Sequence, residues 1–79
     1  MFINYDAKGK KLKKSLAVKI SKQYIAENEE LELFGQGDTE EEAVEDLKLT
    51  LLDIYEDLSM DDGFDNSEGY AKKFFAYFE

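Results

Sequence analysis

Residues 39–58, which read TEEEAVEDLKLTLLDIYEDL, decide the fold of this chain. Thr39 and Glu42 have the spacing of a capping box, in which each side chain bonds the backbone amide of the other residue. Glutamates in the first turn also suit the positive end of the helix dipole. Apolar residues then recur every three or four positions, at Val44, Leu47, Leu51, Ile54 and Leu58, with Ala43, Leu52 and Tyr55 beside them. This spacing predicts a long amphipathic helix that packs one face on another layer.

The segments before this helix have the patterns of strands and turns. Residues 2–5 form a short β-prone run, and Gly9 favours a turn after it. Between residues 12 and 26, Leu16, Val18 and Ile20 alternate with smaller or polar residues, which predicts a strand with one buried face. A polar turn at residues 28–30 and a strand over residues 31–34 would complete a hairpin. The glycines in residues 35–38 then predict the end of the sheet.

The last twenty residues are first polar and then aromatic. Residues 59–69 are acidic and rich in turn formers, which predicts a loop. Residues 70–78 fit a helix or a fourth strand; the helix is favoured, with Ser67 as its N-cap and with core packing of the aromatic rings. The sequence therefore predicts a single α+β domain over residues 1–79. It would hold a three-stranded antiparallel sheet with one long helix packed across it and a short C-terminal helix (or fourth strand).

Charge is distributed unevenly along the 79 residues, whose net charge is −9. Residues 1–22 hold seven lysines and one acid, whereas residues 23–79 hold three lysines and eighteen acids. The chain contains no His, Cys or Arg, so no histidine can activate a nucleophile and no thiolate can bind a metal. We therefore expect no enzymatic activity and no cofactor. Without an apolar run near the ~20 residues of a membrane span, we expect a cytoplasmic protein with no membrane contact.

The acidic residues of the second part of the chain form the candidate binding surface. The candidate partner-binding residues are Glu32, Glu40, Glu41, Glu45, Asp46, Asp53, Glu56 and Asp57. If their side chains line one flank in the solvent, they would attract a basic protein rather than nucleic acid itself. Their carboxylates could imitate phosphates and occupy the groove of a nucleic-acid-binding enzyme. They could also serve only to keep a small domain in solution.

The lysine cluster around Gly9 has two interpretations. It comprises Lys8, Lys10, Lys11, Lys13 and Lys14. The cluster has no arginine for bidentate phosphate contacts and no aromatic residue between its lysines for base stacking. Protection of an exposed strand edge is the favoured role. The lysines could also meet the acidic flank of a second copy, which would give a homodimer.

An acidic segment between the two expected helices resembles a calcium loop in its spacing. Oxygen-bearing side chains fall at ligand positions of an EF-hand-like loop, at Asp57, Ser59, Asp61, Asp65 and Glu68. The sharp turn of such a loop needs glycine, but this chain has Asp62 there, and Gly63 follows one residue late. We therefore expect a solvated acidic loop and no metal site.

Residues 34–43, which read FGQGDTEEEA, resemble the strand-to-helix junction of the HicB-type antitoxin family. The resemblance covers residues 31–58. It implies a small antiparallel sheet with one long helix, and it implies binding to a small toxin nuclease whose substrate surface is blocked. The Tyr-x-Val-x-Phe-Pro-Asp-Leu-Pro stretch usual upstream in that family is missing, and we expect no DNA-binding domain. An alternative is a phage or mobile-element inhibitor that imitates nucleic acid and blocks a host defence nuclease, as in anti-CRISPR or anti-restriction proteins.

Overall fold

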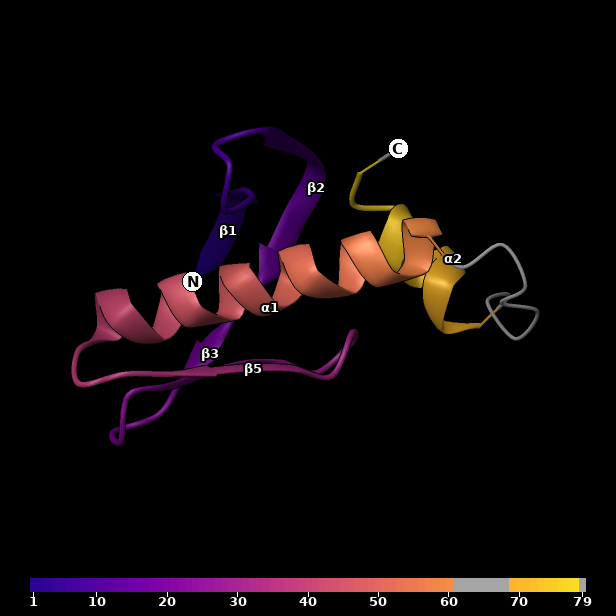
Figure 1. Ribbon diagram of the computed structural model, residues 1–79. Coiled ribbons are helices and arrows are strands. Elements are labelled where there is room, and N and C mark those ends of the chain that lie inside the picture. Colours follow the sequence, from indigo (N-terminus) through magenta and orange to yellow (C-terminus); the bar gives the residue numbers. More distant parts are fainter. Residues whose placement is uncertain (61–68, 79) are drawn as a thin grey trace.

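The computed structural model describes residues 1–60 and 69–78 of the chain. Within those residues the strands precede a long helix and a short one (Figure 1). The elements are β1 (Phe2–Tyr5), β2 (Lys11–Ala17), β3 (Lys19–Ile20), β4 (Ile25–Asn28), β5 (Leu33–Gln36), α1 (Glu40–Met60) and α2 (Tyr70–Phe75). The α+β class with antiparallel strands and one long helix is confirmed. The prediction of one three-stranded sheet is wrong, because β1 and β2 form one sheet and β3, β4 and β5 form another.

The two sheets arise because one extended segment pairs with different partners along its length. β2 and β3 follow each other with only Val18 between them; β1 pairs with β2, and β4 pairs with β3. The side chain of Asn28 joins the sheets where they meet. Its Nδ2 donates to the carbonyl oxygen of Ala17 at 2.7 Å, and its Oδ1 accepts from the backbone N–H of Leu31 at 2.7 Å. Asn28 is buried, and its bond to Leu31 is made away from water.

The predicted strand over residues 12–26 is wrong in its second part, because the chain turns at residues 21–24. The Ser21 hydroxyl oxygen accepts hydrogen bonds from the backbone N–H groups of Gln23 at 3.3 Å and Ile25 at 3.4 Å. Tyr24 completes the turn with a φ of +54°. A serine that bonds the backbone two residues on favours a turn over a strand. The alternation before the turn is confirmed, since Val18 is buried and Ile20 packs against the core.

The predicted break of the sheet at residues 35–38 begins too early, because β5 extends through Gly35 to Gln36. Gly35 is buried beneath α1. A methyl group there would lie 2.8 Å from the Cα atom of Leu47, and closer still to the Leu47 nitrogen and the Ala43 carbonyl oxygen. Gly35 therefore lets the backbone of α1 approach the strand directly, which no residue with a side chain could allow.

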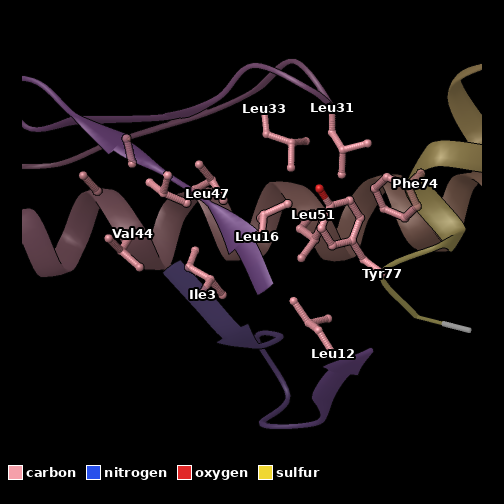
Figure 2. Close-up of a cluster of buried hydrophobic side chains, with 13 residues drawn as sticks. Ile3, Leu12, Leu16, Leu31, Leu33, Val44, Leu47, Leu51, Phe74 and Tyr77 are labelled. Carbon is pink, nitrogen blue, oxygen red and sulfur yellow. The ribbon is translucent and has the colours of Figure 1, made fainter. Parts of the chain in front are cut away.

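The core lies between α1 and the inner face of the strands (Figure 2). The predicted apolar stripe of α1 is confirmed: Val44, Leu47 and Leu51 are buried, and Ile54, Tyr55 and Leu58 pack against the core. Ile3, Leu12 and Leu16 meet them from β1 and β2, Leu33 meets them from the start of β5, and Leu31 meets them from the turn before β5, where a strand over residues 31–34 was predicted. The helix begins as predicted, since the N–H of Glu42 donates to the Thr39 hydroxyl oxygen at 3.1 Å.

The C-terminal segment closes one end of the core. The predicted helix is confirmed over Tyr70–Phe75, with Gly69 at its N-cap position rather than Ser67. Phe74 and Tyr77 are buried, so core packing explains most of the aromatic residues there. The predicted loop begins too early, because α1 continues to Met60. Most of the calcium-like segment, including Asp61, Asp65 and Glu68, lies outside the described residues.

Candidate protein-binding surface

The solvent side of α1 carries most of the predicted binding residues. α1 contains eight acids and one lysine. Because Ala43, Leu47 and Leu51 turn toward the strands, the helical period places the opposite side in water. We call that side the acidic face, and define it as Glu41, Glu45, Leu49, Asp53 and Glu56, all of which are exposed. The four carboxylates among them were all predicted to bind a partner.

Leu49 lies at the centre of the acidic face. Its side chain is 50% exposed, although the sequence analysis assigned it no role. Residues three and four positions apart are neighbours on a helix, so Leu49 is bordered by Glu45 and Asp53, and by Asp46 and Leu52. An apolar side chain surrounded by carboxylates has the composition of an interface anchor with a charged rim. Leu49 lies on the side of the helix opposite the buried apolar stripe, and this position in the helical period was the sequence signal that could have identified it.

Asp46 differs from the other predicted residues, because it bonds within the protein. It is partly buried, and one carboxylate oxygen accepts from the backbone N–H of Gln36 at 3.0 Å. One turn further on, the Thr50 hydroxyl donates to the carbonyl oxygen of Phe34 at 3.4 Å. Both bonds occupy the outer edge of β5, which would otherwise offer free backbone groups to another strand. Asp46 thus holds α1 against β5.

The remaining predicted residues lie around the acidic face rather than in its middle. Glu40 is the first residue of α1 and lines a shallow cleft with Met1, while Asp57 is exposed near the other end of the helix. Glu32 is not on α1. It occupies the turn between β4 and β5 with a φ of +54°, and its charge adds to burial in raising the pKa of Tyr70. The structure therefore brings together the acids of α1 but separates Glu32 from them.

A second cluster joins the hairpin of β1 and β2, which we call the lysine-rich hairpin, to the C-terminal segment. The Lys14 ammonium lies 4.0 Å from a Glu30 carboxylate oxygen and 4.4 Å from the centre of the Tyr77 ring. The Tyr77 hydroxyl donates to the same carboxylate, and burial together with this bond raises the pKa of Tyr77 to about 12. Lys14 and Glu30 form the one ion pair found within residues 1–60 and 69–78. The carboxylates of the acidic face therefore remain available to an outside cation.

The lysines of the lysine-rich hairpin are exposed to solvent. Its single acid, Asp6, is buried and accepts hydrogen bonds from the backbone N–H groups of Lys8 and Lys10, each at 2.9 Å. Gly9 supplies the positive φ of +82° that the turn requires. Next to this turn, Tyr5 of β1 is exposed and pairs with Lys11, whereas Phe2 is exposed at the other end of β1 and pairs with Ala17. The sequence analysis missed this juxtaposition, because it depends on which strands pair.

Neither a metal site nor a membrane helix is found in the part of the chain that the structure describes. Within it, no group of three or more acidic residues is arranged to hold a metal ion. None of its helices has the length and apolar character needed to cross a membrane. Comparison with protein-family models, curated proteins and solved structures finds no match to this chain.

Proposed function

We propose that this protein is a non-catalytic binding module whose acidic face docks on a basic surface of another protein. The observation that carries the proposal is Leu49, which is half exposed at the centre of the carboxylates of α1. Carboxylates on the rim would accelerate encounter with a cationic partner, and the leucine would supply apolar area that is buried on contact. The absence of His and Cys supports a role that needs no reaction.

The mode of binding that fits best is a helix lying in a groove. Leu49 and Leu52 are three residues apart, so both can enter one apolar depression of a partner. Glu45, Asp53 and Glu56 would then meet basic side chains at the edges of that depression. A groove with an apolar floor and basic edges is typical of enzymes that bind nucleic acid, and filling it would inhibit such an enzyme.

Two kinds of partner remain open within this proposal. The resemblance of residues 31–58 to HicB-type antitoxins favours a small toxin nuclease. The carboxylates of the acidic face support, as the alternative, an inhibitor that imitates nucleic acid and blocks a host defence nuclease. A toxin antagonist should be encoded beside a short basic protein and protect cells from it. A mimic should be displaced from its nuclease by competing DNA or RNA.

The experiment uses two matched substitutions of exposed apolar residues. Leu49→Asp changes the centre of the acidic face, whereas Phe34→Asp changes a residue that is 58% exposed on β5. Proteins retained by the tagged wild-type chain in its own cells are identified, and the purified partner is titrated calorimetrically with each variant. We expect Leu49→Asp to weaken binding at least about tenfold, as loss of a hot spot does, and Phe34→Asp to leave it unchanged.

A charge-reversed variant completes the test. Changing Glu40, Glu41, Glu45 and Glu56 to Lys should abolish binding while circular dichroism shows the same helix content, because these residues are exposed. Full affinity in this variant, or equal losses for Leu49→Asp and Phe34→Asp, would overturn the proposal. Either result would assign the acids a role in solubility alone.

A further inference from the structure

A partly enclosed cleft lies where α1, the turn after β1 and the C-terminal segment meet. Its volume is about 210 Å³. Its apolar wall consists of Leu52, Tyr55 and Phe78, and its charged wall consists of Asp6, Lys8, Lys10 and Glu56. We call it the Asp6 cleft and define it by these residues. An apolar cavity of about 150 Å³ is enough to hold benzene, so the Asp6 cleft has room for one ring and a few further atoms.

The apolar wall is held in place by packing within the protein. Leu52 is three residues before Tyr55 and four before Glu56, so all three lie on one side of α1. The ring centres of Tyr55 and Phe78 are 4.7 Å apart. The Phe78 ring also stacks on the buried ring of Phe74, with 5.2 Å between their centres. The wall is therefore formed before any ligand arrives, while Leu52 and Phe78 remain only partly buried.

Asp6 is the residue of this cleft that points to a ligand, because its side chain is only 9% exposed. Its Oδ1 accepts the backbone N–H groups of Lys8 and Lys10, but no hydrogen bond to its Oδ2 is found within residues 1–60 and 69–78. No fully buried side-chain oxygen of those residues lacks a partner, so Oδ2 reaches the cleft. Backbone bonds hold Asp6 in place, one from its N–H to the Lys10 oxygen at 2.9 Å. Oδ2 is thus available to a donor in the cleft.

The charges that line the Asp6 cleft are balanced but not paired with one another. Asp6 and Glu56 supply two carboxylates, and Lys8 and Lys10 supply two ammonium groups. None of the four belongs to an ion pair within the described residues. A purely cationic ligand would meet the two lysines, and a purely anionic ligand would meet the two acids. A ligand that carries both charges beside an apolar group would complement the whole cleft.

We propose that the Asp6 cleft binds a free α-amino acid with an apolar side chain. The ammonium group would donate to Asp6 Oδ2 and to the Glu56 carboxylate. The carboxylate of the ligand would meet Lys8 and Lys10, and its side chain would pack on the apolar wall. Small-molecule sites have this composition, with apolar walls and a few polar groups that fix orientation. The inference goes beyond the proposed function, since it concerns a small ligand and not the docking of a protein.

A lysine side chain of a basic protein is the competing occupant of the cleft. Its aliphatic stem could lie on the apolar wall, and its ammonium group could donate to Asp6. It would, however, add a third cation beside Lys8 and Lys10 and bring no anion for them. An amino acid supplies that anion, and for this reason it fits the cleft better.

The first test titrates the purified chain with phenylalanine and with two analogues, followed by NMR. 2-Phenylethylamine lacks the carboxylate, and 3-phenylpropanoate lacks the ammonium group. We expect saturable binding of phenylalanine with a Kd of about 1 mM or tighter, and binding of each analogue weaker by about tenfold or more. Absence of saturable binding up to about 10 mM phenylalanine would overturn the inference. Equal affinity for 2-phenylethylamine would assign the cleft to a cation and would also overturn it.

The second test changes the charged wall. Asp6→Asn keeps an oxygen that can accept the two backbone N–H groups of the turn, but it replaces Oδ2 with a donor. We expect it to weaken phenylalanine binding about ten- to a hundredfold with unchanged circular dichroism. Glu56→Gln should act in the same direction and changes only an exposed residue. Asp53→Asn is the matched control, because Asp53 is exposed on α1 outside the cleft. Equal affinities for the control and both cleft variants would contradict the inference.

The outcomes separate this inference from the proposed function. Leu49 does not line the cleft, so Leu49→Asp should bind phenylalanine like the wild type. Asp6 is buried, so Asp6→Asn should leave the docking of a protein on the acidic face unchanged. Loss of phenylalanine binding in Leu49→Asp would show that the cleft is not an independent site and would overturn the inference.

Discussion

The long helix of this small protein and the sheet of β1 and β2 carry different charges. The solvent side of α1 presents carboxylates around Leu49, whereas β2 presents lysines, one of which pairs with the exposed Tyr5 of β1. The two layers are not opposed surfaces, because Glu56 of α1 lines one cleft with Lys8 and Lys10. A net charge of −9 therefore describes neither layer.

The contact between the layers is the point at which substitution should have the largest effect. Gly35→Val would force a side chain into the backbone of α1 at Leu47, where no flexible atom can yield. We expect a loss of unfolding free energy on the order of 4 kcal/mol or more, measured by urea denaturation. Gly69→Ala is the control, because a methyl group there meets nothing within 4 Å. Similar stabilities for the two variants would show that α1 does not pack directly on β5.

The junction of the two sheets should be the next most sensitive position. Asn28→Ala leaves the Ala17 carbonyl and the Leu31 amide without their partner in a buried site. Each buried group left unpaired costs about 1–3 kcal/mol, so the urea midpoint should fall clearly. Gln23→Ala, in an exposed turn, should change the free energy of unfolding by less than about 0.5 kcal/mol. An unchanged midpoint for Asn28→Ala would contradict its role in joining the sheets.

The free energy of unfolding should fall at alkaline pH, because a hydrogen bond from Tyr77 to Glu30 attaches the C-terminal segment to the sheet layer. The pKa of Tyr77 is raised to about 12 in the folded protein, against 10.0 for an ordinary tyrosine. The unfolded state therefore loses its proton first, and the stabilisation is complete below pH 10 and lost as the pH rises through 12. Urea titrations across this range should show a steeper fall for the wild type than for Tyr77→Phe. Parallel curves would show that the Tyr77–Glu30 bond contributes nothing to this dependence.

Local signals in the sequence predicted the helices better than the sheets. The Thr39 cap and the spacing of Leu47 and Leu51 involve residues within a few positions of one another, and both are confirmed. The turn at residues 21–24 was missed, because the apolar alternation continues up to it while Ser21 bonds the backbone instead. The role of Gly35 could not be predicted, because it depends on α1 crossing that position.

As with the fold, the sequence predicted those features of the candidate surfaces that lie within one element. Acids on the solvent side of α1 follow from the helical period alone, so Glu45, Asp53 and Glu56 were identified correctly as exposed. The bond between Asp46 and Gln36 joins residues ten positions apart and was not foreseen. The pairing of Tyr5 with Lys11 required the strand register. Sequence patterns therefore indicated the surface of one element and missed the contacts between two.

The measurement that tests the account most directly is chemical-shift mapping by NMR on the intact chain, titrated with a short oligolysine peptide. We predict that oligolysine shifts the amide signals of Glu45, Leu49 and Asp53 and leaves those of Lys11 and Lys13 unchanged. No shift at the three residues of α1, or equal shifts at Lys11 and Lys13, would contradict the account.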